Sequence, residues 1–311
     1  MQGRIAPTDF DWFRHLARET HWDEVNFWKP SATRGFGAAP GTPFFFKLKS
    51  PYNAIAGFGQ VARFDRLPEL LAWDCFGEAN GAGSYAEMRR QIQRIRDRNK
   101  IQDAGGVPQI GCILLRHAVF FPRERWIRQP ADWPARNLID KIYDLSHGEG
   151  QRIWRACLEN AIQLGVSPYL ADEEADGPRF GKLQLVAPRL GQGTFRVAVT
   201  EAYDRACAVT REHSLPALDA AHIKPFVERG PHEIPNGLLL RADLHRLFDK
   251  GYLTVTPERR LEVSPRLRTE YENGHTYYPH HGRRIILPAD PVMHPNPNFL
   301  RWHNENVYLG G

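Results

Sequence analysis

Cysteine is scarce in this chain of 311 residues, which contains Cys75, Cys112, Cys157 and Cys207 and no Cys-x-x-Cys pair. Cysteines so few and so scattered exclude a disulfide-stapled scaffold, and without the paired spacing we do not expect a structural zinc site. Cys207 has no cysteine near it in sequence, so we expect it to pack as a small buried hydrophobic side chain.

Long hydrophobic runs are also missing. Runs such as Ile113, Leu114 and Leu115 are far shorter than the roughly 20 apolar residues of a membrane-spanning helix. Residues 1–7 contain no apolar signal core. We therefore expect a cytoplasmic protein with reduced cysteines.

The rest of the composition is ordinary for a globular protein, with 42% hydrophobic and 25% charged residues. The length is about twice that of a typical domain, which favours two domains. The net charge of +5 permits a nucleic-acid partner but does not require one.

The first half of the chain alternates strand patterns with helix patterns. We expect strands at residues 43–49, 54–64 and 110–121, and helices near residues 8–18, 67–76, 84–99 and 150–164. Strands interrupted by helices, with Gly and Pro at the corners, predict a small, partly open barrel that carries helices. Pro, Gly and several acids mark residues 166–182 as a linker between domains at residues 1–165 and 183–311.

The residues that indicate chemistry lie in three stretches, 218–225, 236–240 and 243–251. The first predicts a short strand, and the third predicts a helix whose apolar face includes Leu244 and Phe248. On that helix His245 and Asp249 are four residues apart and therefore share one face. A strand histidine facing this pair suits a divalent cation beside a general base.

These stretches resemble the HNH endonuclease family and its ββα-metal fold. The resemblance lies in His-Ile-Lys-Pro at 222–225, Asn-Gly-Leu-Leu-Leu at 236–240 and Asp-Leu-His-Arg-Leu-Phe-Asp at 243–249. Weaker matches before and after them extend it over about residues 183–310. The expected fold class is therefore α+β, with a barrel-like first domain and a ββα-metal nuclease domain.

The resemblance implies roles for individual residues. His222 would be the general base, Asn236 would pin the loop that aims it, and His245 and Asp249 would bind Mg²⁺, Mn²⁺ or another transition metal. Many family members have a further ligand directly before the base, where this chain has Ala221. Asp219 is the nearest acid, but strand alternation would place it on the face opposite His222, which makes it the weaker candidate ligand.

Structural roles compete with these assignments. A single histidine such as His222 is more often a core residue, but its matching partners Asn236 and His245 favour catalysis. Asp249 could instead pair with Arg246 or Lys250. His232 lies in the loop, where we expect a solvated side chain.

The first domain resembles PUA-like domains, which hold a flipped modified base in an aromatic pocket; the resemblance covers about residues 40–160. Tyr52, Phe58 and Trp73 are the candidate pocket walls. Taken individually, each of them is more often a buried core aromatic.

A helix at residues 84–99 is rich in arginine, including Arg89, Arg90 and Arg94. These side chains could neutralise DNA phosphates, or they could simply form a solvated helix face.

Together these features predict a metal-dependent DNA endonuclease that acts on double-stranded DNA and restricts DNA with modified cytosine. One alternative is a nucleic-acid-binding protein whose nuclease half has decayed, since Ala221 departs from the family pattern. Another is a nicking or homing-type HNH nuclease without modification dependence. The sequence leaves open whether the protein is a homodimer.

Overall fold

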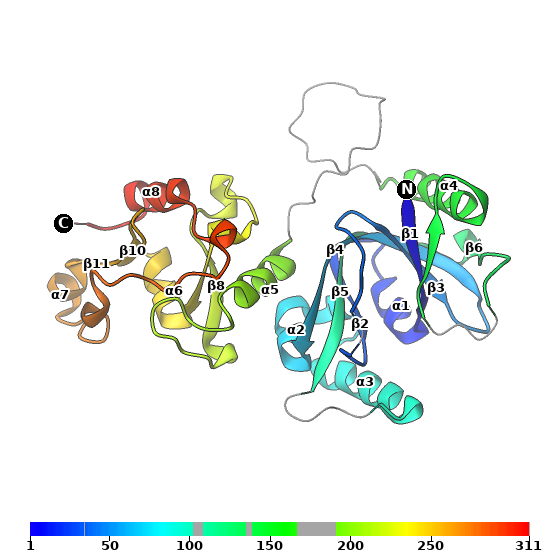
Figure 1. The fold of residues 1–311 in the computed structure, drawn as a ribbon, viewed down its shortest axis with the longest axis horizontal. Helices are drawn as coiled ribbons and strands as arrows, with labels where there is room; N and C mark the ends of the chain where they lie inside the picture. Colours follow the sequence, from blue (N-terminus) through cyan, green and yellow to red (C-terminus); the bar gives the residue numbers. More distant parts are fainter. Residues whose placement is uncertain (34, 102–107, 135–138, 167–190, 311) are drawn as a thin grey trace, which may run out of the picture. The chain divides into compact units, whose positions relative to one another are not determined.

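The computed structural model describes residues 1–33, 35–101, 108–134, 139–166 and 191–310. The chain divides into two compact units, Met1–Pro188 and Arg189–Gly311 (Figure 1). Of the predicted linker, only Val166 belongs to the described residues. Within these ranges every helix is too short or too polar to span a bilayer.

The first unit is built on one mixed sheet. Its strands are β1 (Gln2–Thr8), β2 (His21–Lys29), β3 (Pro43–Leu48), β4 (Ala54–Pro68), β5 (Gln109–Phe120), β6 (Ile127–Arg128) and β7 (Lys141–Asp144). The order is β2-β5-β4-β3-β1-β7, with β6 paired to β4, and only β1 and β3 run parallel. Within the described residues the two end strands, β2 and β7, do not pair with each other, so the predicted partly open barrel is not confirmed.

Helices cover both faces of this sheet. They are α1 (Phe10–Leu16), α2 (Glu69–Phe76), α3 (Tyr85–Asn99) and α4 (Gly148–Gln163). All six residues of β3 are buried, as expected of a strand covered on two sides. Because neighbouring residues point to opposite faces, Phe46 packs on Trp12 of α1 and Phe45 packs on Trp154 of α4.

Where local sequence signals were strong, they predicted these elements correctly. Ser84 caps α3 by accepting a hydrogen bond from the backbone N–H of Glu87 (3.2 Å), and the Glu87 carboxylate accepts one from Gly83 (3.0 Å). Strands β1 and β2 were not predicted. Pro7 interrupts the strand pattern of β1, and both strands are stabilised by partners distant in sequence, β3 and β5.

The second unit contains two pairs of strands and four α-helices in the described residues. Its elements are α5 (Gln192–Ala202), β8 (Leu218–His222), β9 (Gly237–Arg241), α6 (Ala242–Asp249), β10 (Leu253–Val255), β11 (Leu261–Val263), α7 (Arg266–Tyr271) and α8 (Pro297–Asn306). Strands β8 and β9 form one antiparallel pair, and β10 and β11 form the other. Helix α6 follows β9 directly, which completes a strand–strand–helix unit.

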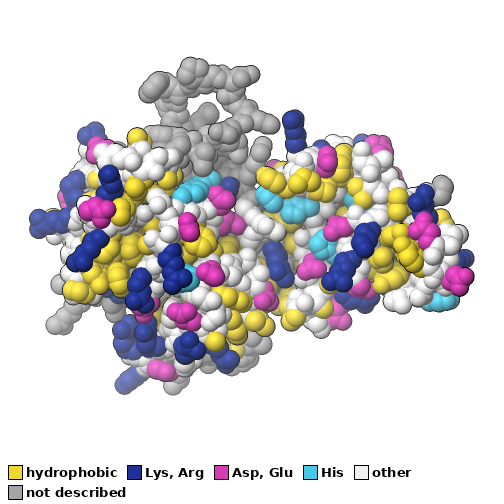
Figure 2. Space-filling view, turned by 180° about the vertical axis from the view of Figure 1, so that it is seen from behind, with side chains coloured by type: hydrophobic (Ala, Val, Ile, Leu, Met, Phe, Trp, Pro, Cys, Tyr) yellow, Lys and Arg dark blue, Asp and Glu magenta, His cyan; other side chains and the backbone are white. Residues whose placement is uncertain are grey.

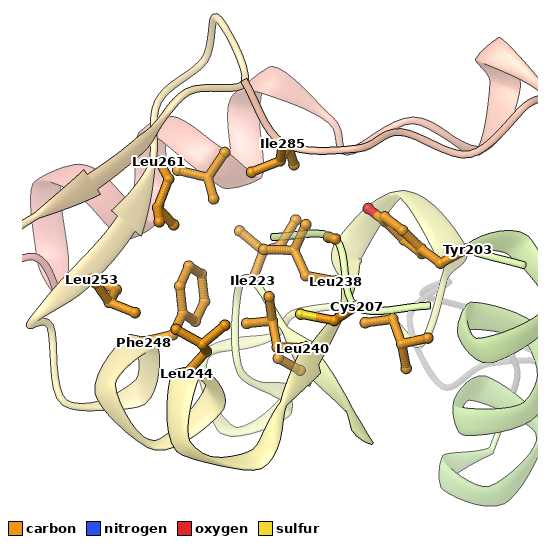
Figure 3. Packing of buried hydrophobic residues seen from close by; sticks show 14 of the residues in the cluster. Tyr203, Cys207, Ile223, Leu238, Leu240, Leu244, Phe248, Leu253, Leu261 and Ile285 are labelled. Atoms are coloured by element: carbon orange, nitrogen blue, oxygen red, sulfur yellow. The ribbon is translucent and has the colours of Figure 1, made fainter. Parts of the chain in front are cut away.

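Helix α6 divides its residues between the core and the surface. Leu244 and Phe248 point into the hydrophobic core of the unit, toward Leu238 and Leu253 (Figure 3). Cys207 is fully buried in the same core, as predicted. His245 and Asp249 each follow a core residue by one position, so the packing of α6 places both on a neighbouring face of the helix.

Candidate active site

A cavity of about 490 Å³ lies beside β8 and α6 in the second unit. Most of its polar lining comes from three elements: Gln192 and Arg196 from α5, Asp219 and His222 from β8, and His245 and Asp249 from α6. The cavity therefore brings together the strand histidine and the two helix residues that the sequence pattern singled out. Gln192 and Arg196 were not predicted as site residues, although they lie before the three motifs, within the range of about residues 183–310 over which the chain resembles the HNH family.

Asp219 lies in this cavity too, contrary to the expectation from strand alternation. The core residues of β8 are Leu218 and Ala221, three positions apart, so the strand does not alternate strictly. The burial pattern of β8 therefore departs from the two-residue period of an ideal strand between Asp219 and His222. As a result Asp219 and His222 both reach the cavity.

His245 stands between two carboxylates. Its Nδ1 lies 3.4 Å from Oδ2 of Asp219, and its Nε2 lies 3.3 Å from Oδ2 of Asp249. Burial raises the pKa of Asp249, the charge of Asp219 raises it further, and His245 opposes the shift. Two carboxylates that repel each other across a partly desolvated site favour a cation between them.

The donor types of these side chains suit a hard or borderline divalent cation, since carboxylates suit Mg²⁺ and an imidazole also suits transition metals. Among the described residues, no group of three or more His, Cys, Asp and Glu side chains has a ready-made metal geometry. The protein donors therefore fit a cation that takes its remaining ligands from substrate and water.

His222 is half-buried, at the end of β8. Its ring stacks on Phe195 of α5, with the centroids 3.9 Å apart and the planes inclined by 14°. Burial, together with the charges of His232 and His245, lowers the pKa of His222 to about 4. The imidazole is therefore neutral at pH 7, which is the state that a general base requires.

The expectation of a solvated His232 was wrong. This side chain is half-buried, and its Nδ1 lies 2.9 Å from Nε2 of His222. The loop that carries His232 is long enough to fold back on β8. The spacing of residues in the sequence does not predict such a contact.

Asn236 ties the two ends of this loop together. It is fully buried, its Oδ1 accepts a hydrogen bond from the N–H of Lys224 (2.9 Å), and its Nδ2 donates to the carbonyls of Lys224 and Pro231 (2.9 Å each). The loop between β8 and β9 is thereby closed just beyond His222.

We expect Asn236→Ala to destabilise the second unit by about 3 kcal/mol, at roughly 1 kcal/mol for each lost hydrogen bond. Urea denaturation of the purified full-length chain measures this. The control is Asn298→Ala, which removes an exposed asparagine of α8. Equal loss in both variants would contradict a special role for Asn236.

His303 also borders the cavity, but its contacts belong to the core. It is 2% exposed, its Nδ1 lies 2.8 Å from Oγ1 of Thr254, and its Nε2 lies 3.2 Å from the carbonyl oxygen of Phe248. The ring also stacks on Phe248 at 3.7 Å. It holds α8 to α6 rather than facing a substrate.

Burial lowers the pKa of His303 to about 4, which predicts an acid-sensitive fold. Between its ordinary pKa of about 6.5 and 4, the unfolded chain binds more protons than the native state, so stability falls as pH falls. The full effect is about 3 kcal/mol for this residue. Urea denaturation at pH 7.5, 6 and 5 should show a shallower pH dependence in His303→Gln than in the wild type, and parallel curves would contradict the assignment.

The three aromatic residues proposed for a base pocket occupy different surroundings in the first unit. Tyr52 stacks on Phe10 with centroids 4.5 Å apart, and Trp73 is half-buried on α2. Phe58 is 3% exposed and packs on Trp154, so its ring has no open face for a base. Phe58 is therefore a core residue, because β4 is covered on the side to which it points.

The arginines of α3 differ in their availability. Arg89 and Arg90 are exposed, and Figure 2 shows Lys and Arg side chains spread over the first unit with acidic side chains among them. Arg94 forms an ion pair with Asp11 of α1 at 2.9 Å. Arg89 and Arg90 are the better candidates for phosphate contacts, because the carboxylate of Asp11 already offsets the charge of Arg94.

Comparison with known families decides the nature of the second unit. Residues 207–256 match the family model described as HNH endonuclease. This unit contains an HNH endonuclease domain. The matched segment includes His222, Asn236, His245 and Asp249, so the HNH resemblance drawn from the motifs is confirmed for this part of the chain.

Two solved structures show distant likenesses. The ASCH protein from Zymomonas mobilis is 12% identical, with a TM-score of 0.31 over 49% of this chain and 94% of its own. A modification-dependent TagI restriction endonuclease is 14% identical, with a TM-score of 0.27 over 93% of this chain and 78% of its own. No curated protein matches the chain. TM-scores this low carry no argument about function, so what this chain does is inferred from the HNH match and the residues of the cavity.

Proposed function

We propose that this chain is a metal-dependent endonuclease that hydrolyses the phosphodiester bonds of double-stranded DNA. One observation carries the proposal: the cavity of the HNH domain combines a neutral histidine, His222, with His245 between two carboxylates. A base and a cation site that face one space are the two parts that phosphodiester hydrolysis needs.

His222 would act on the attacking water. As the water oxygen bonds to phosphorus, the imidazole takes the water proton, the bond from phosphorus to the leaving oxygen breaks, and the leaving oxygen takes a proton from solvent water. Arg196, at the cavity wall, would neutralise a phosphate oxygen. Asn236 acts indirectly, by holding the loop beside His222.

Asp219, His245 and Asp249 would hold the divalent cation, with phosphate and water as its other ligands. When bound, a Mg²⁺ or Mn²⁺ ion supplies positive charge to the phosphate and the leaving oxygen. The role of Asp219 compensates for Ala221, which cannot bind a metal where other family members have a ligand.

We further propose that the first unit is a PUA-like reader that selects DNA with modified cytosine. Support comes from the two-unit architecture, the half-buried aromatic Trp73, and the exposed Arg89 and Arg90 on α3. An aromatic face would stack on the flipped base, and the arginines would hold the backbone.

One digestion series tests both proposals. A single plasmid is prepared with plain, 5-methyl or 5-hydroxymethyl cytosine, and each form is incubated with and without Mg²⁺ or Mn²⁺. We expect linear products only with metal, and only from a modified plasmid. Equal cutting of all forms would remove modification dependence, nicked circles alone would indicate a nicking enzyme, and binding without cutting would indicate a decayed nuclease.

A further inference from the structure

We propose that His232 is a positioning residue that sets the tautomer of His222. In this arrangement Nε2–H of His222 donates to Nδ1 of His232, which leaves the lone pair of Nδ1 on His222 to take the proton from water. The catalytic consequence rests on the nuclease function proposed above, whereas the hydrogen bond itself does not.

The two imidazoles are held on both sides. Their facing nitrogens are 2.9 Å apart and their planes are inclined by 70°. Phe195 stacks on His222, and Phe226 stacks on His232 with centroids 4.8 Å apart and planes inclined by 18°. Phe226 is 63% exposed to solvent, and its stack on His232 gives a reason for an aromatic side chain at this exposed position.

The backbone before His232 is closely constrained. Asn236 donates to the carbonyl of Pro231, and Gly230 donates to the carbonyl of Pro225 at 3.0 Å. A Cβ on Gly230 would lie 1.8 Å from the carbonyl oxygen of Lys224, so only glycine fits this close approach. The loop thus delivers His232 to a defined place beside His222.

The direction of this hydrogen bond decides whether His222 can act as a base. A neutral imidazole carries one proton, so one ring nitrogen donates and the other accepts. If His222 donates from Nε2, its Nδ1 is free to accept a proton. If His232 donated instead, Nδ1 of His222 would carry the proton and could not act as a base.

A neutral acceptor also suits this cavity. An additional carboxylate here would compete with Asp219 and Asp249 for the cation. His232 orients the ring without adding negative charge, and it continues to accept from Nε2–H after His222 has taken up its proton.

Two variants of nearly equal size test the role of His232. Asparagine can place an oxygen near the position of Nδ1, and leucine has the same shape without polar atoms. We expect His232→Leu to lower kcat about 10- to 100-fold with KM almost unchanged, and His232→Asn to restore most of the loss. Equal kcat in the leucine variant and the wild type, or a loss confined to KM, would overturn the proposal.

Nuclear magnetic resonance of the metal-free full-length chain gives a readout independent of cleavage. Nitrogen-15 shifts of the histidine rings at pH 7.5 distinguish the tautomers, and His222→Gln assigns the signal of His222. We expect the Nε2–H tautomer in the wild type and a mixture in His232→Leu. An Nδ1–H tautomer in the wild type would overturn the proposal even if the enzyme cuts DNA, and the expected tautomer in a protein that cuts nothing would overturn only the nuclease function.

Discussion

Replacing His222 with alanine is expected to abolish DNA cleavage while leaving the fold and the affinity for DNA nearly intact. General bases contribute about 10²- to 10⁴-fold to a rate, and no other described imidazole of the cavity is placed to take over. His245 lies between two carboxylates and His303 is held in the core. Plasmid linearisation measures the rate, and a DNA-binding titration measures the affinity.

The matched control for this prediction is His275→Ala, since His275 is an exposed histidine of the same unit. It should cut DNA as the wild type does. Thermal unfolding of both variants shows whether the loss of the stack on Phe195 has disturbed the fold. Cleavage by His222→Ala within about tenfold of the wild type, far less than a base contributes, would contradict its assignment as the base.

Removal of the metal or of its ligands is expected to have an effect of similar size. A chelator should stop cleavage, and Mg²⁺ or Mn²⁺ should restore it. His245→Ala should weaken metal binding, measured by calorimetry, by more than about 100-fold. Loss of a residue that only orients a ligand already costs about 10- to 100-fold, and this change would remove one of the three proposed ligands itself.

Asp249→Asn refines the same experiment, because it keeps the shape of the side chain and removes its charge. It should also weaken metal binding, whereas His275→Ala should bind metal as the wild type does. Unchanged affinity in both His245→Ala and Asp249→Asn would place the metal elsewhere in the chain.

The elements of the site follow from local patterns in the sequence. The apolar spacing of Leu244 and Phe248 predicts a helix that turns one face to a core, and the helical period then puts His245 and Asp249 side by side. Pro225 and Gly251 mark where the strand segment and the helix end. Such signals act over a few residues, so they can be read without the fold.

Other features of the site depend on contacts between distant segments. Asp219 joins the cavity because β8 departs from strict alternation, and the contact between His222 and His232 depends on how the loop closes around Asn236. Neither an irregularity within a strand nor the path of a loop is encoded in residue spacing.

The first unit shows the same division between local and tertiary information. The aromatic strand at β3 and the cap of α3 at Ser84 follow from the residues alone, because strand propensity and capping are local properties. Folding brings β1 beside β3, encloses Phe58 between the sheet and α4, and pairs Arg94 with Asp11, and none of these contacts can be read from the local sequence. These outcomes depend on which surfaces meet when distant segments pack, since burial and ion pairing are properties of the folded chain.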